Sequence, residues 1–181
     1  MTRGPFLDDA LSQFRKYKGY ADAAMAQVDD AAFFAVLGPE ENSIALIAKH
    51  VAGNQRSRWT DFLGSDGEKP DRQRDEEFER RDADTRAALL ARWEEGWRLL
   101  FAAVEPLREA DLTRTVTIRR EPHSVLQAVA RQQTHYAYHV GQIVALARHH
   151  AGAGWKSLSI PRGQSAAFDV ARDGKPYGLP S

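Results

Sequence analysis

The chain has 181 residues, with 25 basic and 25 acidic side chains, a formal net charge of zero and no cysteine. Its length is about that of one domain, and the balanced charge argues against nucleic-acid binding through phosphate contacts. The absence of cysteine excludes a disulfide-stapled module and any metal site built on protein thiolates. No stretch has the length and apolarity of a membrane span or a signal peptide. The lack of cysteine fits a cytoplasmic protein, which is what we expect.

Apolar residues at helical spacing predict four long amphipathic helices. The first carries an apolar stripe over residues 10–28 and is followed by an interruption over residues 33–39. A helix-start cluster at residues 39–43 opens the second helix, which continues to about residues 59–63. The third extends over residues 89–104, where Trp93 and Trp97 fall on the apolar face and are expected in the core.

Two connections interrupt the helical pattern. Residues 66–86 hold nine acidic and six basic side chains, which is typical of a solvated linker that runs into the third helix. Residues 115–119 alternate between polar and apolar types and predict a short extended segment.

The fourth helix is expected to start near Pro122 and Ser124 and to end at Gly152. Gly141 lies in its middle and costs ~1 kcal/mol relative to alanine, so we expect a close approach of a second helix there. The pattern predicts an all-α fold, a four-helix bundle with a short extended segment before the last helix. We expect one domain over residues 1–181, with the bundle at about 7–151 and an irregular tail at 152–181.

Histidine placement is the chemical signal that remains after the common motifs are found absent. His135 and His139 are four residues apart, so on a helix they share one face about 6 Å apart along its axis. They lie beside the apolar stripe, and His50 lies in the same way on the second helix. Three imidazoles from two helices can ligate a divalent metal and leave a position open for water or substrate. The alternative is three ordinary histidines that hydrogen-bond their neighbours.

Other polar residues near these histidines have two interpretations. Asn54 and Gln142 either orient a ligand imidazole or a bound water, or are ordinary buried amides. Tyr138 either presents its phenol to the pocket or lies on the rim. His149 and His150 fall in the last turn of the helix and His123 in a loop, so we expect them to lie outside the site.

Longer segments resemble a known superfamily. The runs KHVAGNQRSRW and THYAYHVGQI, together with SRWTDFLGSDGEKPDRQRDEEFE and the tail WKSLSIPRGQSAAF, are similar to the DinB-like (YfiT-like) superfamily of four-helix bundles. The segment SRWTDFLGSDGEKPDRQRDEEFE and the tail are similar to one bacterial branch that is known mainly as a domain of unknown function. The likeness covers roughly residues 7–168.

The resemblance implies an up-down-down-up bundle that forms a homodimer. It implies a metal bound by His50, His135 and His139, with zinc or nickel first and iron, manganese or cobalt as further options. Relatives in the superfamily include transferases that use low-molecular-weight thiols. The resemblance also gives the charged 64–86 stretch a second interpretation, as a lid or a dimer contact with Arg58 or Asp61 as partners.

These observations lead to three hypotheses about function. The first is a metal-dependent enzyme, a thiol-S-transferase or a hydrolase that acts on a small molecule through metal-activated thiol or water. The second is a non-catalytic protein that holds a metal or small ligand in the same pocket. The third is a structural bundle with core histidines. None involves nucleic acid or a membrane.

Overall fold

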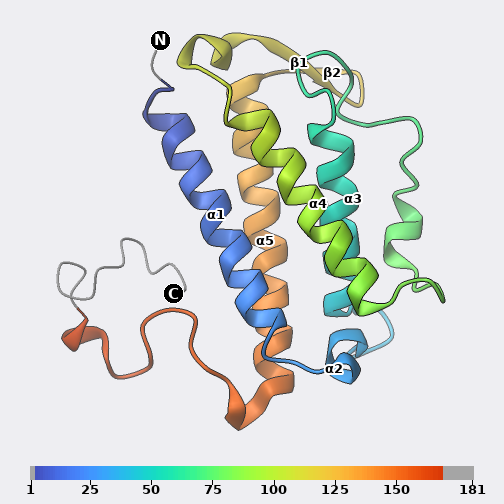
Figure 1. Ribbon diagram of the computed structural model, residues 1–181, viewed down its shortest axis with the longest axis vertical. Helices are drawn as coiled ribbons and strands as arrows, with labels where there is room; N and C mark the ends of the chain where they lie inside the picture. The colour runs from blue at the N-terminus through green and yellow to red at the C-terminus, as the bar shows by residue number, and fades with distance from the viewer. Residues whose placement is uncertain (1–2, 169–181) are drawn as a thin grey trace.

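The chain is mostly helical, with a small two-stranded sheet, in a computed structural model that describes residues 3–168 (Figure 1). The long helices are α1 (Pro5–Met25), α3 (Ile44–Trp59), α4 (Arg86–Val104) and α5 (Val125–Ala151). Hydroxyls cap the last three: Ser43, Thr85 and Ser124 accept hydrogen bonds of 3.2, 3.2 and 3.1 Å from the amide three residues ahead. These caps explain why the starts of the helices could be predicted to within a few residues.

The apolar faces of the long helices meet in one core. α3 packs on α4 and α1 packs on α5, while α3 also contacts α5 and α1 contacts α4. Figure 1 shows that α1 and α5 run in one direction and α3 and α4 in the other. The prediction that Trp93 and Trp97 lie in the core is confirmed, since both are fully buried. The Trp97 ring lies 5.6 Å from the ring of Tyr136 on α5, which joins α4 to α5.

A short helix, α2 (Asp30–Phe34), lies where the sequence predicted an interruption. Asp29 caps it by accepting a hydrogen bond of 2.8 Å from the amide of Ala32, and Phe33 is fully buried in the core. The predicted interruption is therefore wrong at residues 33 and 34, because one buried aromatic and one cap suffice for a single turn.

The two strands form a hairpin between α4 and α5. β1 (Thr115–Ile118) pairs antiparallel with β2 (Glu121–Ser124), so the predicted extended segment is one of two strands. The turn residues Arg119 and Arg120 have φ values of 54° and 65°, a left-handed conformation that suits Asn-Gly far better than two arginines.

Asp66 compensates for this strained turn from a distant part of the chain. Its carboxylate accepts hydrogen bonds from the amides of Arg119 (2.8 Å), Arg120 (2.7 Å) and Glu68 (2.7 Å). Burial works to raise the pKa of Asp66, but the amides of Glu68, Arg120 and Arg119 outweigh it and lower the pKa to about 2. The N-terminal end of the charged stretch is therefore bound to the hairpin.

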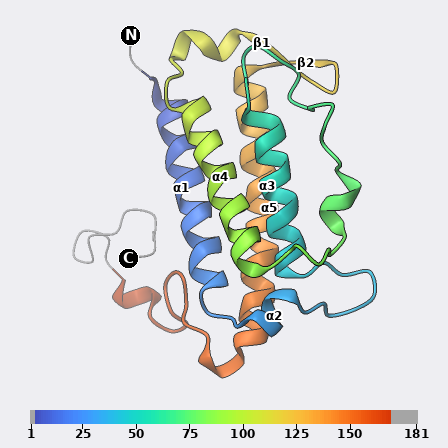
Figure 2. The ribbon, with the colours of Figure 1, turned by 45° about the vertical axis from the view of Figure 1, so that its right-hand side comes forward.

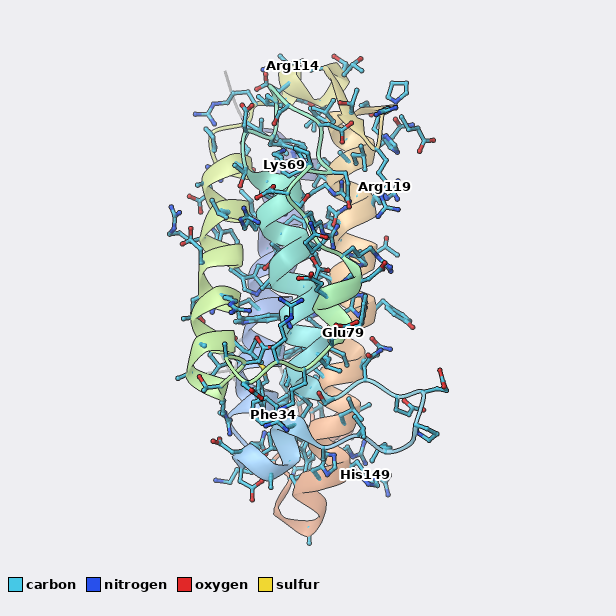
Figure 3. All side chains as sticks on the ribbon, turned by 90° about the vertical axis from the view of Figure 1, so that its right-hand side faces the viewer. Phe34, Lys69, Glu79, Arg114, Arg119 and His149 are labelled. Atoms are coloured by element: carbon cyan, nitrogen blue, oxygen red, sulfur yellow. The ribbon has the colours of Figure 1, made fainter. Side chains whose placement is uncertain are left out.

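The rest of the charged stretch also packs on the protein, so its interpretation as a solvated linker is wrong. The stretch follows α3 along its length and includes a short 3-10 helix, η1 (Asp75–Phe78) (Figures 2 and 3). Near its end, the buried Lys49 donates to the carboxylate of the buried Asp84 (2.6 Å) and to the carbonyl of Glu79 (2.7 Å). Ion pairs formed within the fold thus offset the burial of these charges.

Gly141 and the C-terminal tail are the remaining features on which the sequence made a prediction. Gly141 is exposed, and a Cβ built there would meet no atom within 4 Å, so the predicted close helix approach is wrong. In the tail, Trp155 and Leu158 pack against the core, and residues 169–181 lie outside the described residues. Within residues 3–168 no helix is long and apolar enough to cross a bilayer.

We expect Asp66→Asn to lower the free energy of unfolding by about 1 kcal/mol at pH 7, because the amides of the turn lose a charged acceptor. The pKa of Asp66 is depressed in the folded state, so the carboxylate stabilises the fold above about pH 4. Its contribution is lost as the pH falls towards 2. Urea titrations at several pH values should show the gap between wild type and variant closing over that range. Asp75→Asn, at a side chain that is 98% exposed, serves as the control. An unchanged gap from pH 7 to 2 would contradict the role of Asp66.

Candidate metal centre

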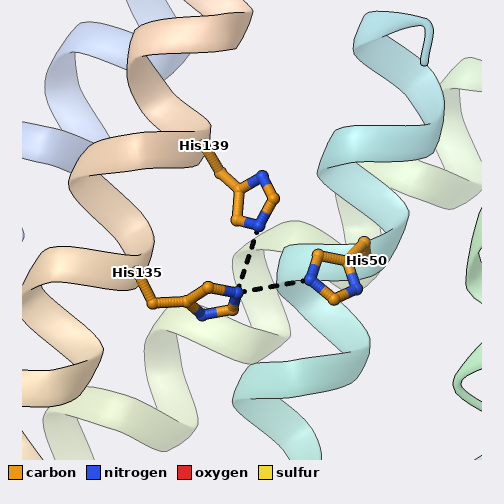
Figure 4. Close-up of side chains that lie close together, drawn as sticks. All are labelled: His50, His135 and His139. Carbon is orange, nitrogen blue, oxygen red and sulfur yellow. Dashed lines mark hydrogen bonds between the residues drawn. The ribbon is translucent and has the colours of Figure 1, made fainter. Parts of the chain in front are cut away.

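Three imidazoles from two helices meet between α3 and α5 (Figure 4). Nε2 of His135 lies 3.3 Å from Nε2 of His50 and 3.1 Å from Nε2 of His139. One ring nitrogen of each residue lies within 4.8 Å of the others. The structure therefore brings together the three histidines that sequence spacing singled out. Within residues 3–168 they are the one group of three or more His, Cys, Asp or Glu side chains with such convergent ligand atoms.

Two of the three nitrogen–nitrogen separations suit a divalent transition metal. Two nitrogen ligands of a tetrahedral zinc ion, each bonded at about 2.0–2.1 Å, lie about 3.3 Å apart. The two Nε2 separations of His135 are close to that value. Three neutral nitrogens form one face of such a coordination sphere and leave a further position open.

The outer nitrogens of two of the rings are held by acceptors, which fixes their tautomers. Nδ1 of His50 lies 2.8 Å from a carboxylate oxygen of Glu77, and Nδ1 of His139 lies 2.8 Å from the amide oxygen of Gln142. Both Nδ1 atoms therefore donate, so in the neutral rings the Nε2 lone pairs point to the centre. This is how proteins orient imidazole ligands.

Hydrogen bonding among the three rings cannot satisfy all of their inner nitrogens. Nε2 of His50 and of His139 both present lone pairs to Nε2 of His135. A neutral His135 carries at most one hydrogen on that atom, which serves one neighbour and leaves the other lone pair unmet. A cation between the rings would accept a lone pair from each of the three inner nitrogens. The three side chains are therefore arranged better for binding a metal than for hydrogen bonding to one another.

The surroundings keep two of the rings neutral. Burial lowers the pKa of His135 to about 3, and the charges of His139, His50, Arg58 and Arg72 add to this effect. Burial and His50 lower the pKa of His139 to about 4, although the hydrogen bond to Gln142 opposes them. Both imidazoles are therefore unprotonated at neutral pH, the form that binds a metal.

Arg72 and Gly53 determine the position of the Glu77 carboxylate. Arg72 grips this carboxylate with two hydrogen bonds of 2.8 Å, from Nε to Oε1 and from Nη2 to Oε2. Burial raises the pKa of Glu77, but the hydrogen bonds from His50 and Arg72 outweigh burial and hold it below its usual value. Gly53, almost one turn after His50, makes room for this carboxylate, because a Cβ there would clash with Oε1 of Glu77.

The other predicted residues lie at different distances from the rings. Gln142 contacts His139 and donates to the hydroxyl of Tyr138 (3.3 Å), whose side chain is 64% exposed and lies on the rim. Asn54 is buried and accepts a hydrogen bond of 3.0 Å from the hydroxyl of Tyr136, so it joins α3 to α5 and orients no histidine.

The remaining histidines lie apart from the centre. His149 and His150 are in the last turn of α5, as expected, and Figure 3 shows His149 at that end of the molecule. His123 is on β2, where its ring faces Arg131 at 3.3 Å.

Sequence reasoning missed the residues that the charged stretch contributes. Glu77 and Arg72 fix His50, and the ring of Phe78 stacks on the His50 ring with centroids 4.6 Å apart. No local pattern distinguishes Glu77 from the eight other acidic residues of the stretch. Its partner His50 is 27 positions away in the chain, so only the folded path of the stretch shows the contact.

Comparison with known proteins gives a family and no activity. Residues 2–164 match the family described as "Protein of unknown function (DUF1572)". The chain belongs to this family. No curated protein and no solved structure is similar enough to count as a match.

We expect Glu77→Gln to weaken zinc binding by about tenfold or more, because His50 loses the charged acceptor that orients it. The measurement is competition of the protein with a chromophoric zinc chelator. Glu76→Gln is the matched control, since Glu76 pairs with Arg81 at the surface. Equal zinc affinity in both variants and wild type would show that Glu77 does not support the site.

Proposed function

We propose that this chain is a divalent-metal-dependent enzyme of the DinB-like kind, acting on a small molecule as a thiol-S-transferase or a hydrolase. The observation that carries the proposal is the convergence of a ring nitrogen from each of three histidines. In His50 and His139 the tautomer is fixed because Nδ1 donates to Glu77 and to Gln142 respectively. In a histidine cluster with a purely structural role, each buried inner nitrogen is expected to have a hydrogen-bond partner, and here one lone pair has no donor.

The course of the helices supports the same proposal. α1 and α5 run one way and α3 and α4 the other, with a long connection between α3 and α4 (Figure 1). An up-down-down-up four-helix bundle of the DinB-like superfamily has this course, and the three histidines lie on its second and fourth long helices.

The residues of the chain have separate roles in this chemistry. A bound divalent metal lowers the pKa of a thiol or water and so makes it nucleophilic at neutral pH. His50 and His139 hold their Nε2 lone pairs inward by donating from Nδ1, and Phe78 covers one face of the His50 ring. Glu77 faces the outer nitrogen of His50, so it orients a ligand and is not placed as a general base. The chain has no cysteine, so the thiol of a transferase reaction comes with the substrates.

Metal content tests the site itself. Protein expressed without a His tag should carry about one equivalent of a transition metal, and His135→Ala should lose it because two imidazoles bind far more weakly than three. His149→Ala, on the same helix outside the centre, should keep it. A content below about 0.1 equivalents in wild type, unchanged by His135→Ala, would overturn the proposed site.

Activity separates the enzyme from a protein that only binds. Metal-loaded protein is assayed with chlorodinitrobenzene and epoxide electrophiles against a panel of cellular thiols, and with ester substrates in the absence of thiol. We expect wild-type protein to turn over at least one substrate and the His135→Ala variant to turn over none. Turnover that requires a thiol indicates transfer, and turnover without a thiol indicates hydrolysis. Full metal content with no turnover in any assay would instead favour a non-catalytic metal- or ligand-binding protein.

A further inference from the structure

A polar cavity of about 200 Å³ opens directly beside the three histidines. His50 and His135 form part of its wall, so a molecule in the cavity lies next to the metal centre. Most of the rest of the lining consists of five arginines from four segments of the chain: Arg58, Arg72, Arg74, Arg119 and Arg131.

The carboxylates near the cavity are fewer than these arginines. Glu77 is bound by Arg72, and Glu68 lies 3.1 Å from Arg72, 3.3 Å from Arg119 and 3.8 Å from Arg58. Asp75 lies 3.7 Å from Arg74, but its side chain is 98% exposed and is screened by water. Arg131 contacts Nε2 of His123, which also lies 3.8 Å from the carboxylate of Glu121, a side chain that is 71% exposed and screened by water. The chain as a whole is neutral, so this positive excess is local.

Arg58 is the least satisfied of the five. It is 4% exposed, and its Nε and Nη1 atoms have no hydrogen-bond partner among the described residues. Gly67 leaves the space that it occupies, since a Cβ there would lie 2.9 Å from Nη1. Burial, with Arg72 and Arg131 nearby, lowers the pKa of Arg58 despite the opposing effect of Tyr136 and Glu68. Buried guanidinium donors without acceptors are costly, and an oxyanion is the group that best matches their geometry.

A second buried group in the wall lacks a partner as well. Gln132 is 2% exposed, lines the same cavity, and has an amide oxygen with no donor within the described part of the chain. The cavity therefore offers cationic donors together with one buried acceptor beside the imidazoles. The arginines suit an oxyanion, whereas the Gln132 oxygen needs a hydrogen-bond donor on the same molecule, so the wall suits a small polar anion and not an apolar molecule.

We propose that this arginine-lined cavity binds the oxyanion group, a carboxylate or a phosphate, of the small-molecule substrate and so places the adjoining reactive group at the three histidines. The inference rests on the proposed function for the role of the histidines, whereas anion binding by the cavity stands by itself. Within the thiol chemistry proposed above, it selects thiols that carry an acidic group close to the sulfur.

Anion binding is tested first on metal-free protein, with inorganic phosphate and succinate as separate probes followed by NMR. The variants are Arg58→Met and Arg131→Met, and the control is Arg98→Met, which removes a surface partner of Glu95 on α4. We expect saturable binding of at least one probe to wild type and control, weakened at least tenfold in both cavity variants. The preferred probe tells a phosphate from a carboxylate ligand.

The role beside the metal is tested with cobalt-loaded protein, through the thiolate-to-cobalt absorption band. We expect 3-mercaptopropionate to bind at least tenfold more tightly than 2-mercaptoethanol, which has a hydroxyl in place of the carboxylate. Arg131→Met should remove this preference while cobalt affinity is not weakened, and Arg98→Met should retain it. Because Arg131 is exposed, its variant tests the inference even if Arg58→Met fails to fold.

Three results would overturn the inference: no saturable binding of either probe, equal binding in wild type and Arg131→Met, or equal affinity for the two thiols. Failure of the proposed function looks different. Protein that binds no cobalt but binds phosphate or succinate in an Arg131-dependent way would retain the anion site and lose the metal centre.

Discussion

The contact between His50 and Glu77 is the interaction on which the centre depends. It joins a helix to a charged stretch that has little apolar surface to hold it there, so the stretch is kept in place by buried ion pairs. Arg72 neutralises Glu77, Lys49 neutralises Asp84, and Asp66 ties the beginning of the stretch to the hairpin. A buried pair of charges contributes little net stability but is costly to break, which favours one defined path for the stretch.

That path explains how one segment serves two neighbouring features. The Glu77 side chain fixes the outer nitrogen of His50, while Arg72 and Arg74 from the same stretch line the cavity that we propose binds an anion. The orientation of the His50 ring and the positive charge of the cavity wall thus have a common structural cause. Loss of Arg72 would disturb both, since it contacts Glu77 and Glu68 at once.

The sequence was sufficient for features that depend on local spacing. Periodicity and caps located the long helices, and the four-residue spacing of His135 and His139 with His50 on a second apolar face pointed to one centre. It was insufficient where distant segments meet. In the sequence Gly53 has the pattern of an ordinary helical glycine, and only the structure shows that the Glu77 carboxylate packs against it. The Arg119–Arg120 turn departs from the usual turn residues because Asp66, distant in the chain, accepts hydrogen bonds from its amides. The error at Gly141 is the reverse, because the sequence predicted a close approach of a second helix that the structure does not show there.

We propose that His50, His135 and His139 together ligate one metal ion. Anomalous diffraction at the absorption edge of the metal, from crystals of untagged protein, tests it most directly. We predict a single strong peak between the three rings, with all three Nε2 atoms at about 2.0–2.2 Å from it. A peak elsewhere, or one ligated by His135 and His139 without His50, would rule out a site formed by all three histidines.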